Sequence, residues 1–260
     1  MKRREFMHAT VVGGVAVSAG LRLSQAAEHR HYIALDWYRC RRDQDMQRLR
    51  DFLANSAVPA LGRAGVKPVG AFQTSVGPDS PSILMVKGYA SLAALQESTD
   101  KIAADDRFLA EQKAFDEKWD LAYDRMECSL LSAFKTTPDI EVPKVEPGKT
   151  NLFELRIYES RNLQGHIKKV SMFDTGEIDL FRRVGIVPVF FGATVFGPNM
   201  PNLAYMVAFP SMEARTQAWS AFGQHPEWKK MSTAPGMVDR ELVCRISNQL
   251  MTPLPFSQIK

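Results

Sequence analysis

The alternation of apolar and polar positions predicts the order strand, helix, strand, strand, helix, strand in the second half of the chain. Over residues 153–158, apolar side chains occupy every second position, which is the period of a strand with one buried face. Over residues 163–184 they recur every three or four positions, as in an amphipathic helix, and Gly185 follows where a glycine commonly ends a helix. The β-branched and aromatic runs 186–196 and 203–209 flank a turn rich in glycine and proline, so we expect them to form a hairpin.

The remainder of the second half and the whole first half follow the same order. Ser211 is a suitable N-cap for a helix that reaches about residue 222, a short helix begins near Pro226, and a last strand covers about 241–250. In the first half, Pro59 lies inside the first predicted helix, where we expect a kink. The predicted strand, helix, two strands, helix and strand of that half cover residues 32–38, 43–64, 66–76, 83–89, 91–118 and 124–134.

The two halves also resemble each other residue by residue. With a shift of 120 residues, 32–108 align without a gap to 152–228, and 63–91 match 183–211 at nine of 29 positions. Most of the identical positions are glycines and prolines of the kind that mark turns. We therefore interpret the chain as a tandem repeat of one structural unit.

Each half has the β-α-β-β-α-β order of a ferredoxin-like unit. Such a unit places both helices on one face of its sheet, and the other face is partly apolar here, at Leu84 and Val86 in the first half and at Ala204 and Met206 in the second. We expect an α+β protein in which the two repeats pair sheet to sheet and close a barrel within one chain. The predicted boundaries are 30–135 for the first repeat, 136–150 for a linker punctuated by prolines, and 151–252 for the second repeat.

The N-terminal residues 1–26 have the features of a signal peptide. Arg3 and Arg4 belong to a charged start, a weakly apolar stretch too short for a membrane span follows, and Ser24 and Ala26 stand at the −3 and −1 positions of a cleavage site. The paired arginines, followed by Glu, Phe and Met, resemble a twin-arginine export signal, and a Sec signal is the alternative. We predict a periplasmic or secreted protein that is not an integral membrane protein.

Charge and cysteine content narrow the classes of partner. The net charge is +4, of which residues 1–26 contribute +3, so the remainder carries only +1 and gives no reason to expect nucleic-acid binding. Cys40, Cys128 and Cys244 show no CxxC spacing. An oxidising compartment would allow one disulfide, but we favour three buried free cysteines on strands.

The order of several short motifs in the second half resembles the NIPSNAP family. The strand from Phe153 to Tyr158 is similar to the opening ELRxY strand of NIPSNAP domains, and the similarity extends over about 150–250. The first half is a diverged version, with Ala34 and Asp36 in place of the Glu and Arg of that strand. The resemblance implies the dimeric α/β-barrel fold and no settled activity. The later residues that continue it are Gly185, Gly197, Pro198, Phe209 to Ser211, Arg215 and Pro226 to Trp228.

Five residues of the second half are candidates for a ligand pocket. Glu154, Arg156 and Tyr158 share one strand face, and if that face lines the barrel, Arg156 could hold a carboxylate ligand. The alternative, which we favour, is a buried structural pair that satisfies itself. His166 and His225 could each serve as a general base or a haem ligand, although a histidine in a helix or loop is more often a surface or capping residue.

No motif in the sequence identifies a reaction. Phosphate-binding loops, HExxH, Cys/His metal spacing and nucleophile elbows are absent, so we predict no cofactor and no metal site. We favour a module that binds a small molecule or a protein partner, with a homodimer as a further prediction. The alternative is a cofactor-free or haem-dependent oxygenase, since enzymes of both kinds occur on this barrel fold.

Overall fold

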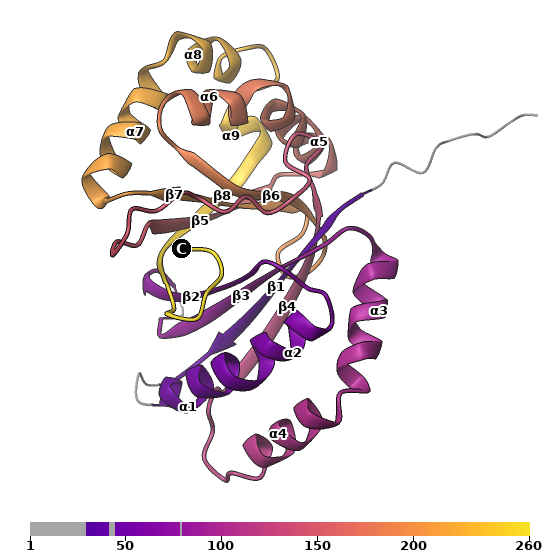
Figure 1. Cartoon of the computed structure of the whole chain (residues 1–260). Coiled ribbons are helices and arrows are strands. Elements are labelled where there is room, and N and C mark those ends of the chain that lie inside the picture. Colours follow the sequence, from indigo (N-terminus) through magenta and orange to yellow (C-terminus); the bar gives the residue numbers. More distant parts are fainter. Residues whose placement is uncertain (1–29, 42–44, 79) are drawn as a thin grey trace, which may run out of the picture.

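Eight antiparallel strands close into a barrel to which each half of the chain contributes four neighbouring strands (Figure 1). The computed structural model describes residues 30–41, 45–78 and 80–260, so the predicted signal peptide lies outside the described residues. The barrel order is β1-β3-β2-β8-β5-β7-β6-β4. The strands are β1 (Tyr32–Arg39), β2 (Val69–Val76), β3 (Ser82–Tyr89), β4 (Arg125–Ala133), β5 (Leu152–Ser160), β6 (Val187–Phe196), β7 (Asn202–Phe209) and β8 (Val243–Pro253).

The two halves meet along two seams of the barrel, where β2 pairs with β8 and β4 pairs with β6. The strands of the first half lie side by side in the order β4-β1-β3-β2, and those of the second half in the order β8-β5-β7-β6. Both are the ferredoxin-like order. The fold prediction is therefore confirmed, with one addition. The two sheets face each other and are also joined edge to edge by hydrogen bonds, because closing the barrel removes all free strand edges.

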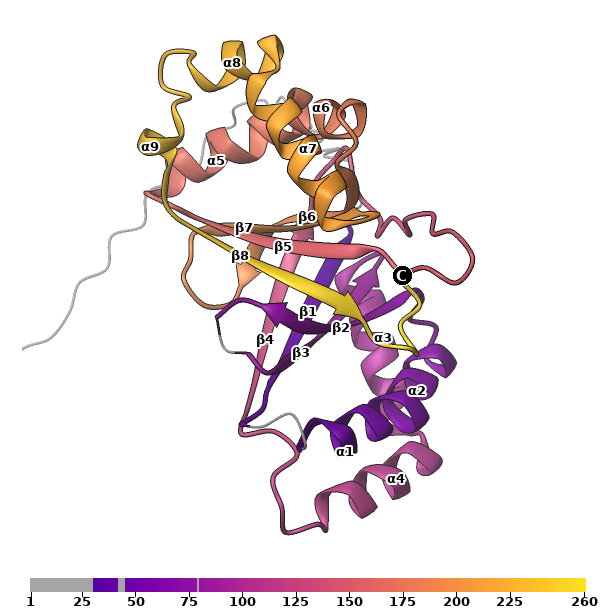
Figure 2. The ribbon, with the colours of Figure 1, turned by 90° about the vertical axis from the view of Figure 1, so that its left-hand side faces the viewer.

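The helices lie outside the barrel, those of the second half on one side and those of the first half on the other (Figures 1 and 2). Within the described residues, no helix has the length and apolar character needed to cross a membrane. The helical segments are α1 (Asp45–Phe52), the π-helix η1 (Leu53–Ala57), α2 (Val58–Arg63), α3 (Leu92–Ala103), α4 (Asp106–Asp116), α5 (Leu163–Met172), the π-helix η2 (Phe173–Glu177), α6 (Ile178–Arg183), α7 (Met212–Gln224), α8 (Pro226–Ser232) and α9 (Asp239–Leu242).

Three apolar cores follow from this arrangement. One core fills the barrel and contains residues of both halves, and the other two lie between each sheet and its own helices. Leu84, Val86, Ala204 and Met206 are all buried in the barrel core, as predicted from the bare apolar faces. Burial of those faces is the main force that holds the halves together, since it removes apolar area from water.

Local structure repeats at the 120-residue spacing found in the sequence. Ser91 and Ser211 cap α3 and α7, each through its side-chain oxygen. The π-helices η1 and η2 begin at Leu53 and Phe173 and have the same length. Because η2 interrupts its helix without any proline, Pro59 alone does not explain the corresponding interruption in the first half.

Other details differ from the sequence-based expectation. The helix predicted over 91–118 is two helices, because the Asp105 side chain accepts a hydrogen bond from the amide of Phe108 and starts α4. Cys40 is buried, but Cys128 and Cys244 are exposed, so the expectation of three buried cysteines was wrong. Met126 on the face of Cys128 and Ile246 on the face of Cys244 are exposed as well. The outer surfaces of β4 and β8 are therefore only partly covered.

The two ends of the barrel are closed to different extents. Ile140 of the linker and Ile259 near the C-terminus both pack against the barrel core at the end where β1 begins. The C-terminal segment is fixed there by backbone hydrogen bonds from Leu254 to Ala71 (2.8 Å) and from Gln258 to Val69 (3.0 Å). At the opposite end, where β1 and β5 finish and the hairpins β2–β3 and β6–β7 turn, the barrel opens into a mouth.

Gly185 and Gly65 end equivalent helices in the left-handed region, with φ of 86° and 92°. After α6, the amide of Ile186 donates to the carbonyl of Phe181 (2.9 Å), as in a Schellman motif, and the first half has the same bond from Val66 to Leu61. Gly185→Val should lower the free energy of unfolding by about 1–2 kcal/mol, because a β-carbon is strained at this φ. Chemical denaturation measures the loss. Gly223→Ala, at an exposed position of α7, is the control and should not destabilise.

Candidate functional site

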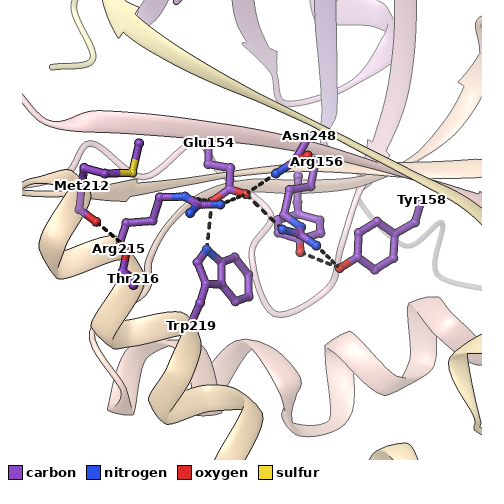
Figure 3. A network of polar contacts seen from close by, with 9 residues as sticks. Glu154, Arg156, Tyr158, Met212, Arg215, Thr216, Trp219 and Asn248 are labelled. Carbon is purple, nitrogen blue, oxygen red and sulfur yellow. Dashed lines mark hydrogen bonds and ion pairs between the residues drawn. The ribbon is translucent and has the colours of Figure 1, made fainter. Parts of the chain in front are cut away.

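Glu154 is the centre of a polar network between the second-half sheet and α7 (Figure 3). Its side chain is fully buried. Arg215 donates to both carboxylate oxygens, with Nε–Oε2 and Nη2–Oε1 distances of 2.7 and 2.8 Å. Trp219 Nε1 donates to Oε2 (2.8 Å), Asn248 Nδ2 to Oε1 (3.0 Å) and Arg156 Nη1 to Oε1 (3.0 Å). Burial raises the pKa of Glu154. The hydrogen bonds from Arg215, Asn248 and Trp219 lower it by more than burial raises it, so the pKa of Glu154 lies below its usual value.

Arg156 extends this network to two tyrosines. Its Nη2 donates to the Tyr158 hydroxyl (3.2 Å), which lies 3.1 Å from the hydroxyl of Tyr205. The guanidinium also lies 4.7 Å from the centre of the Trp219 ring. Burial raises the pKa of the Tyr205 hydroxyl well above its usual value, so both Tyr205 and the carboxylate of Glu154 keep fixed protonation states near neutral pH.

The face that carries Glu154, Arg156 and Tyr158 does not line the barrel. Phe153 and Leu155, the alternating residues of β5, belong to the barrel core instead. The predicted ligand site required the polar face of β5 to line the barrel. The apolar face lines it instead, so this condition is not met. Every oxygen of Glu154 has partners within the protein, which supports the alternative of a structural, self-satisfied cluster.

The two candidate histidines lie apart from this network. His166 is buried in α5, with Nδ1 3.4 Å from the hydroxyl of Ser160, and burial lowers its pKa. His225 is the N-cap of α8 and its Nδ1 accepts a hydrogen bond from the amide of Glu227 (3.3 Å). His225 therefore has the capping role that we considered more common for such a residue.

A second buried charge cluster, not identified from the sequence, lies beneath the helices of the second half. Lys169 Nζ is 3.2 Å from Glu177 Oε2 and 3.1 Å from Asp239 Oδ1, and Lys169 and Glu177 are both buried. Burial raises the pKa of Glu177 to about 6, against the opposing effect of Lys169. A signal was present, because Lys169, Phe173 and Glu177 recur at four-residue spacing on one helical face.

The barrel mouth holds a cavity of about 360 Å³. Leu35 and Trp37 of β1, Leu131 of β4, Ile157 of β5 and Ala204 of β7 provide apolar wall. Polar groups line the rest of it, and they come from both halves of the chain. They include Arg39, Glu127, Glu159, Asn202, Arg245 and Gln249.

The charged residues at the mouth are arranged as pairs. Arg39 Nη2 lies 3.1 Å from Glu127 Oε2, and the Arg39 guanidinium lies 4.5 Å from the centre of the Trp37 ring. On the other half, Arg245 Nε lies 3.8 Å from Glu159 Oε1. The cavity lining thus has two positive and two negative side chains and no net charge.

The two hairpins at the mouth pack closely on the opposite half. A β-carbon at Gly197 would lie 2.7 Å from Ser129 Oγ, and one at Gly77 would lie 2.7 Å from Gln249 Cγ. Within the β6–β7 hairpin, Thr194 Oγ1 donates to Asn202 Oδ1 (2.6 Å). These contacts hold the walls of the mouth in place, because neither hairpin can move without displacing a strand of the other half.

The sequence did not predict the residues of the mouth as a site, although part of the pattern is present in it. Leu35, Trp37 and Arg39 alternate along one predicted strand, so their common face could be read from the sequence. The meeting of six strands at one barrel end required the closed order of the barrel. Three of the five candidate residues predicted from the sequence, Glu154, Arg156 and Tyr158, lie on the face of β5 that points away from the barrel interior.

The mouth does not fit a haem group or a metal ion. Its described lining residues include no histidine, cysteine, methionine or tyrosine, which are the side chains that ligate haem iron. Across the part of the chain that the structure describes, no group of three or more His, Cys, Asp or Glu side chains could hold a metal ion.

Comparison with known proteins supports the NIPSNAP family for the second half. Residues 153–258 match the family model of NIPSNAP. No curated protein matches the sequence.

Solved structures support the fold of both halves together. A monooxygenase-like protein from Fusobacterium nucleatum subsp. nucleatum has a TM-score of 0.59 at 9% identity, over 87% of this chain and 94% of that one. One from Lactobacillus acidophilus has a TM-score of 0.58 at 9% identity, over 86% and 94%. An anthrone oxidase-like protein has a TM-score of 0.52 at 14% identity, over 87% and 92%. At these identities the likeness concerns the α/β-barrel fold alone.

Proposed function

We propose that this NIPSNAP-like barrel protein binds a small, uncharged, partly aromatic molecule in its mouth. The observation that carries the proposal is the 360 Å³ cavity at the open barrel end, to which both halves contribute. Its size lies within the range of about 300–1,000 Å³ that is usual for small-molecule sites. Elsewhere the barrel is filled by its apolar core.

The lining favours a neutral ligand over a charged one. Arg39 and Arg245 already have carboxylate partners in Glu127 and Glu159, so a ligand charge would have to displace one of them. The amide nitrogen of Gln249 offers donors to hydroxyl or carbonyl groups, whereas the amide of Asn202 is already bonded within the β6–β7 hairpin. Trp37 and the aliphatic side chains beside it offer a surface for an aromatic ring.

Titration with 1,4-naphthoquinone and 1,4-dihydroxynaphthalene tests this proposal by calorimetry. We expect saturable binding that Ser247→Leu, inside the mouth, weakens by at least about tenfold, because the larger side chain occupies ligand space. Ser220→Leu, on the exposed surface of α7, is the matched control and should bind as the parent does. Equal affinity of both variants, or no binding to the parent, contradicts a mouth site.

A cofactor-free oxygenase that acts on such a ligand is the second candidate. The structural neighbours include two monooxygenase-like proteins and one anthrone oxidase-like protein, and those descriptions apply to those proteins. The mouth lacks haem ligands, so the candidate takes its cofactor-free form. An oxygen electrode distinguishes the two functions with 1,4-dihydroxynaphthalene. Oxygen uptake above the uncatalysed rate, lost in Ser247→Leu, supports the oxygenase, and uptake at the uncatalysed rate leaves binding alone.

Export completes the proposal, with residues 1–26 as a twin-arginine signal and the mature protein in the periplasm. Support comes from Arg3 and Arg4 and from the cleavage-site residues that follow. Changing both arginines to lysine should abolish periplasmic accumulation, measured by fractionation, because the export receptor distinguishes guanidinium from ammonium. Normal export of the double variant would point to a Sec signal. The homodimer stays a prediction that sedimentation would test.

A further inference from the structure

A second and larger cavity, of about 520 Å³, lies in the first half at the opposite end of the barrel from the mouth. Its walls come from the turn between α2 and β2, the end of β3, one face of α3, and the linker around Ile140. The cavity is separate from the mouth, because no residue lines both. The barrel core and the Ile140 side chain lie between them.

Most polar groups in this cavity are already paired. His31 Nδ1 lies 2.8 Å from Asp139 Oδ1, and Lys101 Nζ lies 2.7 Å from Glu97 Oε1. Ser98 Oγ donates to the carbonyl of Leu95 (2.8 Å). Lys67 differs, because it has no carboxylate partner among the described residues.

The second half shows that the fold does not require these polar groups. The second half has apolar side chains at the positions that correspond, 120 residues later, to Lys67, Tyr89, Ser98 and Lys101. The residue that corresponds to His31 is the buried Asn151, whose side-chain amide donates to two backbone carbonyls. Two of the apolar side chains are buried in the core between sheet and helices. The four apolar counterparts are Val187 for Lys67, Phe209 for Tyr89, Ala218 for Ser98 and Ala221 for Lys101.

The same helix and strands thus fold with apolar residues in one half and with a polar-lined cavity in the other. Tyr89 and Ser98 place polar groups where the second half buries Phe209 and Ala218, which reduces apolar burial and therefore lowers stability. Their presence around a 520 Å³ cavity indicates a ligand that repays them.

We propose that this cavity binds a small organic carboxylate, held at its charged end by Lys67 and along its carbon skeleton by apolar walls. Lys67, an exposed side chain at the edge of the cavity, is the charged lining residue without an ion-pair partner among the described residues, so its ammonium is free to pair with a carboxylate. Ile33, Val66, Ala94 and Ile140 supply the apolar surface. The site is independent of the ligand proposed for the mouth, where both arginines have carboxylate partners and a neutral molecule is expected.

Calorimetric titration of the full chain with benzoate and with benzamide tests the charge requirement. The two probes have similar shape, and only benzoate carries a negative charge at neutral pH. We expect benzoate to bind at least about tenfold more tightly than benzamide, since a charge-assisted contact to Lys67 contributes more than a neutral one. Benzamide binding as tightly as benzoate overturns the proposal.

Three variants locate the site. Lys67→Gln and Ala94→Leu should each weaken benzoate binding by about tenfold or more, the first by removing the charge and the second by filling the cavity. Lys113→Gln, on the exposed surface of α4, is the control for Lys67 and should leave the affinity unchanged. Benzoate affinity unchanged in both cavity variants overturns the proposal, and so does its loss in the mouth variant Ser247→Leu. Thermal unfolding of each variant confirms that it is folded.

Discussion

Glu154→Gln is expected to lower the free energy of unfolding by about 3–5 kcal/mol, measured by chemical denaturation. The substitution keeps the shape of the side chain and removes the charge that Arg156 and Arg215 share. Both arginines then remain beside each other without their anion, in a site where water reaches them poorly. Breaking a buried pair by removing one partner has a cost of this size.

Glu146→Gln is the matched control for this change. Glu146 forms an ion pair with Lys149, but both side chains are mostly exposed, so the substitution should leave the midpoint of unfolding unchanged. A stable Glu154→Gln protein that has lost naphthoquinone binding would contradict the structural role and return Glu154 to the list of ligand-binding residues. We expect the reverse, because Glu154 does not line the mouth.

Lys169→Met is expected to have an effect of similar size, about 3–5 kcal/mol at pH 8. Methionine fills nearly the same space but leaves Glu177 buried without its cation. The loss of the cation costs less at Asp239, because its side chain is 39% exposed and water can solvate the carboxylate. The double variant with Glu177→Gln should recover part of the loss, since no uncompensated buried charge remains.

The loss in Lys169→Met should depend on pH in a defined direction. Burial raises the pKa of Glu177 from 4.5 to about 6 in the folded protein, so the folded state holds this proton more tightly than the unfolded state. The stabilisation by the protonated carboxyl is present below pH 4.5 and is lost as the pH rises through about 6. Without Lys169 the pKa rises further, so the variant should be closest to the parent in acid and furthest from it at pH 8. A loss that is the same at pH 5 and pH 8 would refute the assignment.

Hydrophobic periodicity determined most of the secondary structure, because that pattern is a local property of the chain. Residues 153–158 alternate as a strand must if one face is buried, and β5 covers them. Gly65 and Gly185 lie beyond apolar helical runs, and both have the positive φ that glycine adopts readily. The apolar faces at Leu84 and Met206 predicted the barrel, since pairing the two sheets buries both.

Only the tertiary structure decided which face of β5 enters the barrel. Alternation places Glu154 and Arg156 on one face and Phe153 and Leu155 on the other, but it does not say whether helices or the other half cover the polar face. The answer depends on Arg215 and Trp219 of α7, about 60 residues later, which complete the hydrogen bonds of Glu154. Those partners offset the cost of burying a carboxylate beneath the helices.

The two proposed ligand sites were likewise beyond the sequence. Trp37, Glu159 and Gln249 are far apart along the chain and meet only because the barrel closes through its two seams. The Lys67 cavity depends on the linker passing over the end of β3, where Ile140 packs close to Gly88. The sequence by itself determined the elements and their apolar faces, since both follow from local spacing. Barrel closure and the paths of the connecting segments decided where space remained for a ligand, because those depend on contacts between residues distant in the chain.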